Sequence, residues 1–438
     1  MATELVDASG FQGHADRVFT PASEPELIEI LRDATRERIP ATISGAKTGL
    51  TGGGIPRGGW SVSMEKFGRL EIAPGRAITG AGVSLEALQA AVSPTGQFYA
   101  PDPTEWTASV GGMIVNNASG SRSFRYGATR RHVLGLRVAF MDGTVREFRR
   151  GDKVDFQVPQ IPLPSTAKNT AGYLLQPEMD WIDLLSPSEG TLGVIIEAEL
   201  QLLPKPKDVL AGVIFLESDD AALDAVQAWR DLRGLRMLEY FDRNSLLFLR
   251  QRFPETPESA GVALLIEQEE GEVDYWADHA PEDSWFADND KDRERFRKFR
   301  HALPELVNDT VRRRGFLKLN SDYAVPLHRN REMLACYHAG LRKLGLDYVI
   351  FGHIGDAHVH INILPKSQAE FDAGQELMLE FARQAVAFGG TVSAEHGLGK
   401  RKAKLLSIQY TAEQIEAMKD VKRLLDPHWL LNPGTLFL

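Results

Sequence analysis

Ser44-Gly-Ala-Lys-Thr-Gly-Leu-Thr-Gly-Gly-Gly54 follows a short predicted strand through Thr42-Ile43. Glycines after a strand let the backbone turn tightly and approach a ligand closely. Such a loop can form a nest of backbone N–H groups that neutralises a pyrophosphate, with Lys47 or Thr48 adding a donor. Taken alone, the loop is equally compatible with a plain tight turn. The motif G-x-G-x-x-G occurs nowhere in the chain, which disfavours an NAD-dependent Rossmann dehydrogenase.

Two further glycine-rich stretches have the same character. One is Thr107-Ala-Ser-Val-Gly-Gly-Met-Ile-Val-Asn-Asn-Ala-Ser-Gly120, followed by Arg125-Tyr-Gly127. The other is Ser188-Glu-Gly-Thr-Leu-Gly193, which precedes a predicted strand. Three such loops in one domain predict a long dinucleotide that is threaded along the backbone.

The sequence around these loops predicts a mixed α and β domain. Ser23 and Glu26 form a capping box ahead of a helix that should run to about Arg38. Further predicted elements are a helix from Ser84, a hairpin of Val133–Phe140 and Thr144–Phe148 around Asp142-Gly143, and a strand over Val194–Leu203. Pro204 and Pro206 close that last strand, so we place the main domain boundary there.

Beyond the boundary, apolar runs alternate with amphipathic stretches. The runs are Leu210–Leu216, Leu235–Phe241, Val262–Glu267, Leu317–Val325, Tyr348–His353 and His358–Leu364. The amphipathic stretches start near Ser218, Asp290, His328 and Ala369. This pattern predicts an antiparallel-rich sheet covered by helices, and hence an α+β protein. We interpret Pro254–Ala260 and Asp278–Asp292 as solvated loops.

Composition narrows the function classes. The 438 residues carry 50 Lys and Arg against 60 Asp and Glu, a formal charge of −10 without a basic block, so a nucleic-acid partner is not expected. No apolar run reaches the roughly 20 residues of a bilayer span, and the start of the chain does not resemble a signal peptide. The single cysteine, Cys336, is expected to be a small buried apolar residue. The chain is predicted to be cytoplasmic, with any link to the inner membrane made through a partner.

Two stretches of the second half carry ionisable groups suited to catalysis. In Phe351-Gly-His-Ile-Gly-Asp-Ala-His-Val-His-Ile-Asn362, Gly355-Asp356 predicts a turn, after which His358, His360 and Asn362 share one strand face. His353, before the turn, would face His360 across the hairpin, as two imidazoles do when they share a metal. The alternative is a hairpin whose histidines are only hydrogen-bonded or solvated.

The second stretch is Ser393-Ala-Glu-His-Gly-Leu-Gly-Lys-Arg401. Its glycines predict an exposed, tightly turned segment that presents the Glu395 carboxylate beside the His396 imidazole; a helix-start loop is the alternative. Together the two stretches offer His353, His360 and Glu395 as a two-histidine, one-carboxylate metal set, with His396 as a general base.

The whole chain resembles the FAD-linked 2-hydroxyacid dehydrogenases and oxidases, a group that includes D-lactate dehydrogenase, D-2-hydroxyglutarate dehydrogenase and the large subunit of glycolate oxidase. They belong to the vanillyl-alcohol-oxidase-like flavoproteins with a PCMH-type FAD-binding domain. The segments that carry the resemblance are 45–54, Pro101-Asp102, 107–127, Pro187–Val194, Leu238-Glu-Tyr-Phe-Asp242, Asp322-Tyr-Ala-Val-Pro326, 352–362, Glu395-His-Gly and Asn432-Pro-Gly434. Motifs in this number and order make the match specific.

The resemblance implies an FAD-binding domain over residues 1–204, with subdomains of about 1–76 and 77–204. A substrate or cap domain with an antiparallel sheet would follow over 205–405, and residues 406–438 would return to the flavin. Non-covalent FAD is implied because the loop offers no histidine or cysteine. The implied FAD contacts are Gly45, Lys47, Thr48, Gly49, Leu50, Pro101, Ser109, Gly112, Asn116, Ser119, Tyr126, Glu189, Gly193, Ile195 and Asn432.

The resemblance also implies roles in catalysis. His353, His360 and Glu395 match the group's ligands to a divalent metal, zinc or manganese, and His396 matches its base. Arg300 and Lys318 resemble the cations that bind the substrate carboxylate, although Arg300 also fits a helix-surface charge. The metal would bring the hydroxyl pKa of a small 2-hydroxy acid within reach of His396, and flavin N5 would take the hydride.

Three departures from the group's pattern bear on this reading. Lys47 stands where Gly or Asn is common, Ser44 replaces a frequent Arg, and His358 replaces the usual Asn. His358 would be either an extra neighbour of the metal or a donor in its outer shell. The sequence leaves open the substrate and the oligomeric state, for which a homodimer is one candidate. It also leaves open the electron acceptor, for which a quinone, a cytochrome, an electron-transfer flavoprotein and a partner subunit are candidates. The rival functions are a metal-dependent hydrolase and a flavin-bearing subunit that is inert outside an electron-transfer complex.

Overall fold

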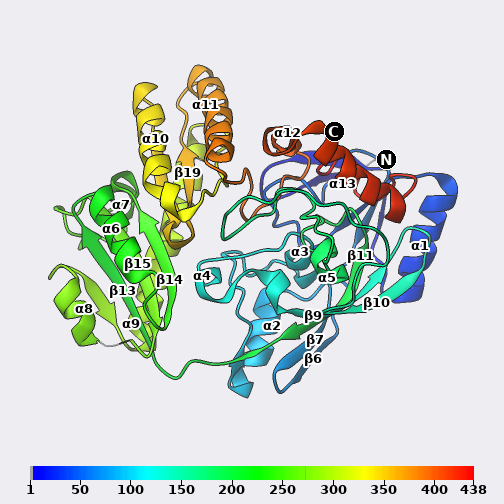
Figure 1. Cartoon of the computed structure of the whole chain (residues 1–438), viewed down its shortest axis with the longest axis horizontal. Helices are drawn as coiled ribbons and strands as arrows, with labels where there is room; N and C mark the ends of the chain where they lie inside the picture. The colour runs from blue at the N-terminus through cyan, green and yellow to red at the C-terminus, as the bar shows by residue number, and fades with distance from the viewer. Residues whose placement is uncertain (1–2, 272) are drawn as a thin grey trace.

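The computed structural model describes residues 3–271 and 273–438, and it divides into two lobes (Figure 1). We call residues 3–204 the N-terminal domain and residues 205–405 the cap domain. Residues 406–438 lie against the N-terminal domain, where the backbone of Leu430 and Asn432 bonds that of Ala41. The α+β class predicted from the sequence is confirmed.

The N-terminal domain is built on a five-stranded antiparallel sheet in the order β10-β9-β11-β7-β6 and a three-stranded parallel sheet in the order β3-β5-β4. Its elements are β1 (Thr3–Val6), β2 (Gln12–Ala15), β3 (Arg17–Phe19), α1 (Glu24–Glu37), β4 (Ala41–Ser44), β5 (Trp60–Ser63), β6 (Leu70–Ala73), β7 (Arg76–Gly80), α2 (Leu85–Val92), β8 (Gln97–Phe98), α3 (Val110–Val115), α4 (Ser123–Tyr126), β9 (Val133–Ala139), β10 (Val145–Arg149), α5 (Trp181–Leu185), β11 (Val194–Gln201) and β12 (Leu203–Pro204). The predicted N-caps are present, since Ser23 accepts from the Glu26 N–H and Ser84 from the Ala87 N–H, but the capping box is not closed, because the Glu26 carboxylate accepts from the Ala22 N–H instead of the Ser23 N–H.

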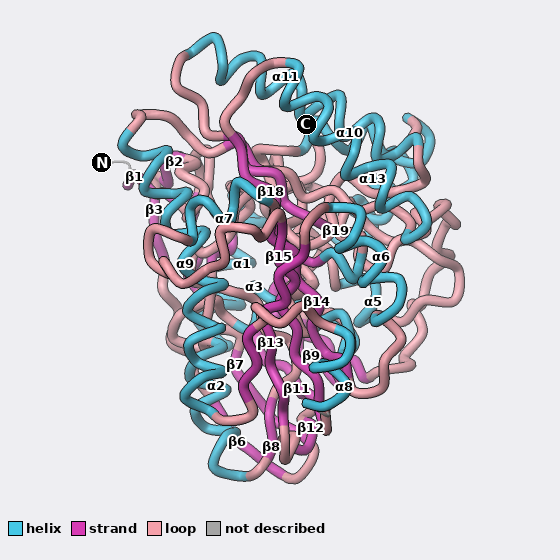
Figure 2. Tube along the Cα trace, turned by 90° about the vertical axis from the view of Figure 1, so that its left-hand side faces the viewer, coloured by secondary structure: helices cyan, strands magenta, loops and turns pink. Residues whose placement is uncertain are grey.

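The cap domain is a seven-stranded sheet in the order β16-β13-β15-β14-β18-β19-β17, antiparallel throughout. Its elements are β13 (Val209–Leu216), α6 (Asp219–Trp229), β14 (Leu235–Phe241), α7 (Arg243–Leu249), β15 (Val262–Glu269), α8 (Val273–His279), β16 (Trp285–Ala287), α9 (Asp290–Arg313), β17 (Leu319–Asn320), α10 (Asn330–Lys343), β18 (Tyr348–His353), β19 (His358–Ile363) and α11 (Gln368–Ala387). Two helices of the C-terminal segment follow, α12 (Leu406–Gln409) and α13 (Ala412–Leu425). Helices α10 and α11 lie at the opposite end of the molecule from β6 in both views (Figures 1 and 2).

Three predictions for the cap domain were wrong. The run Leu317–Val325 is not a full strand, because after β17 the backbone of Ser321 pairs with Ile361 and the chain leaves the sheet. The stretch Asp278–Asp292 is not only solvated loop: it contains β16, which pairs with β13 because Trp285 packs on Phe215 at 4.8 Å between ring centroids. The acidic stretch 254–260 buries Thr256 and Ala260. Cys336 is half-buried on α10.

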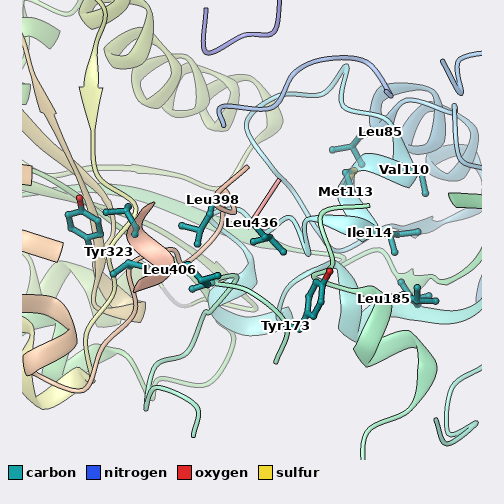
Figure 3. Packing of buried hydrophobic residues seen from close by; sticks show 14 of the residues in the cluster. Leu85, Val110, Met113, Ile114, Tyr173, Leu185, Tyr323, Leu398, Leu406 and Leu436 are labelled. Carbon is teal, nitrogen blue, oxygen red and sulfur yellow. The ribbon is translucent and has the colours of Figure 1, made fainter. Parts of the chain in front are cut away.

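The larger of two hydrophobic clusters runs through both domains (Figure 3), and the second lies within the cap domain. Figure 3 shows Leu85 and Val110 at the N-terminal domain end and Tyr323 at the cap end, with Leu398 and Leu436 between them. The C-terminal residues therefore help to join the two domains. Within residues 3–271 and 273–438, no helix combines the length and the apolar character that a membrane crossing requires.

Candidate active site

A cavity of about 330 Å³ lies between the two domains. The N-terminal domain contributes the glycine loop (residues 45–54), the start and end of α3, and the segment 189–195. The cap domain contributes Arg300 and Pro304 from α9, the end of β18, and His360 from β19, while Glu395 and His396 close the wall between the domains. The site is thus assembled from segments far apart in the sequence.

The glycine loop presents its backbone to this cavity. The N–H groups of residues 46–50 donate no hydrogen bond to any protein group that the structure describes. Lys47 has a φ of 57°, the left-handed conformation that Gly and Asn adopt most readily. A Cβ at Gly45 would lie 2.1 Å from Ser109 Oγ, so the close approach of the loop to the start of α3 requires glycine there. Free N–H groups on a turn are suited to bind a phosphate.

Most of the predicted cofactor residues line the cavity. These are Gly45, Lys47, Thr48, Gly49, Leu50, Ser109, Gly112, Asn116, Ser119, Glu189, Gly193, Ile195 and Asn432. Pro101 and Tyr126 do not line it. Pro101 is buried, and the hydroxyl of Tyr126 donates to Glu269 of the cap domain. Tyr126 thus contacts the cap instead of facing the cavity, because α4 packs beside β14 and β15.

The His396 segment is held over the cavity by the N-terminal domain. The Glu189 carboxylate accepts hydrogen bonds from the N–H groups of Leu398 and Gly399 at 2.8 and 2.7 Å. Burial raises the pKa of Glu189 to about 7 despite these bonds. The prediction that residues 393–401 form an exposed turn was wrong, because this segment is buried between Glu189, Thr51 and Asp322.

The β18–β19 hairpin carries three histidines. The turn predicted at Gly355-Asp356 is present, as a short 3₁₀ turn ended by Ala357 at a φ of 51°. The register pairs His353 with His358, and Phe351 with His360, so the expectation that His353 faces His360 directly was wrong. The two rings still come within 5.5 Å between centroids, because they lie diagonally across the hairpin.

The predicted metal set is brought together, with one addition. One ligand atom from each of His353, His358, His360 and Glu395 lies within 4.8 Å of the others. We call these four residues the His/Glu cluster. The Nε2 atom of His353 is 3.2 Å from Glu395 Oε2, and that of His360 is 4.0 Å from the same oxygen. Imidazole nitrogens and a carboxylate are ligands that zinc and manganese accept.

His353 is linked to Arg300 through Glu239. The Nδ1–H of His353 donates to Glu239 Oε1 at 2.5 Å, and Arg300 Nε donates to the other Glu239 oxygen at 2.9 Å. Burial lowers the pKa of His353, but Glu239 and Glu395 outweigh it and raise the pKa to about 9. Arg300 also donates to Thr104 of the N-terminal domain at 3.2 Å. This chain of bonds fixes the guanidinium at the cavity wall.

Glu395 is oriented by donors on its other oxygen. Lys168 Nζ donates to Glu395 Oε1 at 2.6 Å and lies 3.2 Å from Asp356 Oδ2, while the Ser119 hydroxyl also donates to Oε1. Burial raises the pKa of Glu395, but His353 and Lys168 outweigh it and hold that pKa well below its usual range. The carboxylate is therefore ionised, and its Oε2 atom faces the histidines.

His360 and His396 stack at the cavity wall, 5.3 Å between ring centroids and 15° between planes. His360 Nδ1–H donates to the carbonyl of Ser321 at 3.1 Å, which leaves the Nε2 lone pair free. Burial lowers the pKa of both rings, that of His360 to well below the ordinary histidine range. Both imidazoles are therefore neutral, so His396 can accept a proton.

Asp322 holds the backbone beneath His396. Its Oδ2 atom accepts hydrogen bonds from the Ser393 hydroxyl at 2.7 Å and the His396 N–H at 2.8 Å. Its Oδ1 atom lies 3.2 Å from His358 Nε2 and 3.5 Å from His396 Nδ1. Lys318 does not line the cavity, and burial beside Lys402 lowers its pKa to about 8.

Three residues of this network were not predicted as site residues. Glu239 had a signal, because it is an acid inside the apolar run Leu235–Phe241, and a buried charge needs a partner. Asp322 precedes an apolar stretch and gave a weaker signal of the same kind. Lys168 lies in a long irregular segment between β10 and α5, where no periodicity marks it as buried.

Comparison with known families gives two matches. Residues 15–149 match the family described as "FAD binding domain", and residues 205–436 match "FAD linked oxidases, C-terminal domain". The second match alone covers more than half of the 438 residues.

Similar proteins were found among both sequences and structures. The chain is 32% identical to "D-lactate dehydrogenase" of Archaeoglobus fulgidus over 95% of this chain and 90% of that protein. It is 31% identical to "D-2-hydroxyglutarate dehydrogenase" of Xanthomonas citri pv. viticola, over 95% and 88%. It is 30% identical to "Glycolate oxidase subunit GlcD" of Bacillus subtilis, over 98% and 90%. A solved structure of alkyldihydroxyacetonephosphate synthase superposes with a TM-score of 0.66 at 14% identity, covering 95% of this chain and 76% of that one. That likeness concerns the fold.

Proposed function

The chain belongs to the FAD-linked oxidase family, and from this premise we propose that it oxidises a small 2-hydroxy acid to the 2-oxo acid with FAD as the hydride acceptor. One observation carries the proposal: a single cavity joins free backbone N–H groups at the glycine loop to a buried His/Glu cluster and an arginine. This arrangement favours oxidation over metal-dependent hydrolysis, which would not use the phosphate-binding end.

Non-covalent FAD fits the N-terminal end of the cavity. The unpartnered N–H groups of residues 46–50 suit its pyrophosphate, and a Cβ atom at Gly49 would meet no protein atom within 4 Å, so space exists there for a ligand. Asn432, whose side chain bonds Ile43 N and Glu189 O, would line the flavin end. When bound, the flavin supplies a hydride acceptor.

A divalent metal, zinc or manganese, fits the His/Glu cluster. The support is the donor chemistry and the presence there of buried ring nitrogens without a hydrogen-bond partner. We propose His353, His360 and Glu395 as its ligands. A bound metal would supply a Lewis acid that makes a hydroxyl group more acidic.

The protein's own groups would then bind and deprotonate the substrate. Arg300 would bind the carboxylate, since its guanidinium is fixed at the cavity wall by Glu239 and Thr104. Lys318 remains our second proposed anchor, although it lies outside the cavity lining. His396 would take the hydroxyl proton, because it is neutral, lines the cavity and stacks beside the cluster. The electron acceptor would be a quinone, a cytochrome, an electron-transfer flavoprotein or a partner subunit.

The test is anaerobic bleaching of the bound flavin by a panel of D- and L-2-hydroxy acids. Lactate, glycolate and 2-hydroxyglutarate are compared in the metal-loaded and chelator-treated protein. We expect one acid to reduce the flavin within a single turnover and the chelator to slow this step. A protein purified without flavin, or a flavin that no acid of the panel reduces, would contradict the proposal. In the second case a role as an inert subunit of an electron-transfer complex is favoured.

A further inference from the structure

We propose that His358 is a fourth protein ligand of the divalent metal at the His/Glu cluster. This inference rests on the proposed function, since it extends the set of His353, His360 and Glu395. It turns a site of two imidazoles and one carboxylate into a site of three imidazoles and one carboxylate.

The hairpin places His358 beside the other donors. His358 is the first residue of β19 and pairs directly with His353, the last residue of β18. Its ring lies 4.5 Å from that of His360 and 5.3 Å from that of His353, between centroids. It offers a ring nitrogen within 4.8 Å of the other three donors. The hairpin therefore places His358 at ligand spacing without any rearrangement of the backbone.

The imidazole ring of His358 lacks hydrogen bonds. His358 is fully buried, and neither of its ring nitrogens makes a hydrogen bond to any part of the protein that the structure describes. Buried polar side chains in proteins almost always have a partner, so an imidazole whose Nε2 has only Asp322 nearby and whose Nδ1 has no partner needs another explanation. A bound cation supplies it. His360, in contrast, already donates its Nδ1–H to the carbonyl of Ser321.

Asp322 offers a competing role for His358. Its Oδ1 atom is 3.2 Å from His358 Nε2, but the pair does not meet hydrogen-bond geometry. If the bond formed on a small adjustment, it would occupy one nitrogen and leave the lone pair of the other for the metal. A carboxylate behind a ligating histidine is a common arrangement at metal sites. Asp322 therefore supports a ligand role for His358. If His358 only bonded Asp322 and did not bind the metal, its other ring nitrogen would stay buried without a partner.

A second group of donors makes the inference testable. Asp322, His360 and His396 also bring ligand atoms within 4.8 Å of one another, and they share His360 with the first group. His396 is thus a nearby control, since it is a half-buried histidine beside the same cluster that our proposal does not make a ligand. Three imidazoles also favour zinc or cobalt over magnesium or calcium.

The experiment measures zinc binding by the flavin-loaded protein. After removal of bound metal with a chelator, each variant is dialysed against buffered free zinc, and zinc per chain is determined by mass spectrometry. We expect His358→Asn to weaken zinc binding about 100-fold or more, beyond the roughly 10–100-fold that loss of an outer-shell partner typically costs. His396→Asn should change it far less than His358→Asn does, since His396 is not a ligand in this proposal.

Zinc X-ray absorption gives a readout that does not depend on catalysis. The wild-type spectrum should fit three imidazoles and the His358→Asn spectrum two. His358→Cys should restore binding and add a sulfur at about 2.3 Å, which also guards against a His358→Asn variant that fails to fold. His338→Asn, which removes a buried cap-domain histidine bonded to Tyr348, controls for general destabilisation of this domain.

Four outcomes would overturn the inference. Equal zinc affinity of His358→Asn and the wild type would exclude His358 as a ligand, and so would a spectrum that keeps the same number of imidazoles. Loss of zinc in His396→Asn with retention in His358→Asn would assign the cation to the second group. If the wild-type chain bound no zinc, cobalt or manganese, this inference and the proposed metal set would both fail, whereas flavin bleaching would still test the oxidation itself.

Discussion

At the glycine loop the cavity wall offers backbone N–H groups, whereas at the β18–β19 hairpin it offers buried side chains that are bonded to one another. The glycine-loop end depends on glycine residues and on their local backbone conformation. It needs hardly any charged side chain to balance another charge. The second end buries Glu239, Glu395 and Asp356, and it depends on Lys168 and Arg300 to balance them. Changes at the first end should therefore alter ligand affinity alone, while changes at the second should alter chemistry and stability together.

The largest effect is expected from His396→Ala at the hairpin end. General bases contribute about 10²- to 10⁴-fold to a rate, so flavin reduction in stopped-flow experiments should slow by that factor while FAD stays bound. His279→Ala, an exposed histidine on α8, should leave the rate unchanged. Reduction at the wild-type rate in His396→Ala would remove His396 as the base.

Lys168→Met should cost the next largest amount. It leaves Glu395 and Asp356 buried without their cation, and breaking a buried pair in this way typically costs about 3–5 kcal/mol of unfolding free energy. The matched control is Lys366→Met, which breaks the exposed pair with Asp347 and should cost less than about 1 kcal/mol. Denaturant unfolding of both variants checks the difference. Equal losses would mean that Lys168 does not balance the cluster.

The two domains also differ in how they shift the pKa of a buried histidine. Burial and nearby Arg131 lower the pKa of His132 in the N-terminal domain to about 4, whereas the carboxylates around His353 raise its pKa to about 9. The unfolded chain protonates His132 near pH 6.5, so its contribution to stability is complete above that pH and is lost as the pH falls towards 4, by up to about 3 kcal/mol. The unfolding free energy of the wild type minus that of His132→Gln should fall over this range. A flat difference curve would contradict the assignment.

The smallest effect is expected at the glycine loop. Gly49→Val places a side chain into space that is free of protein atoms, so the stability of the flavin-free protein should change by less than about 1 kcal/mol. FAD affinity should fall about tenfold or more, which corresponds to about 1.4 kcal/mol, because the side chain fills the ligand's space. Gly68→Val, in an exposed turn of the same domain with equally free surroundings, should change neither quantity. Titration with FAD and thermal unfolding distinguish the two variants.

The sequence predicted the N-terminal half well because its signals are local. The caps at Ser23 and Ser84 and the Asp142-Gly143 hairpin each depend on a few neighbouring residues, and the structure has all three. In the cap domain, β16 and the early end of β17 depend on contacts with residues far along the chain. A short strand such as Trp285–Ala287 exists because β13 lies beside it. Periodicity cannot detect that neighbour.

The candidate site shows the same division. His353, His360, Glu395 and His396 were found from short motifs, since metal-binding and acid–base residue types stand close together there. The groups that hold them come from distant segments: Glu239 from β14, Lys168 from an irregular segment and Asp322 from the end of β17. Their role depends on a buried ionic network, which exists only once the chain has folded. The strand register that pairs His353 with His358 also depends on the conformation of the turn, which the motifs alone do not specify.

Asn432 carries a consequence for the order in which the protein matures. Its side chain joins β4 to the Glu189 loop, and its N–H bonds the carbonyl of Ala41. Residues that follow the cap domain in the sequence thus complete the edge of a sheet whose strands precede it, on the wall of the proposed flavin site. A ribosome that has released only the first 204 residues has made a domain that still lacks this closing segment, so cofactor loading should await synthesis of the segment around Asn432.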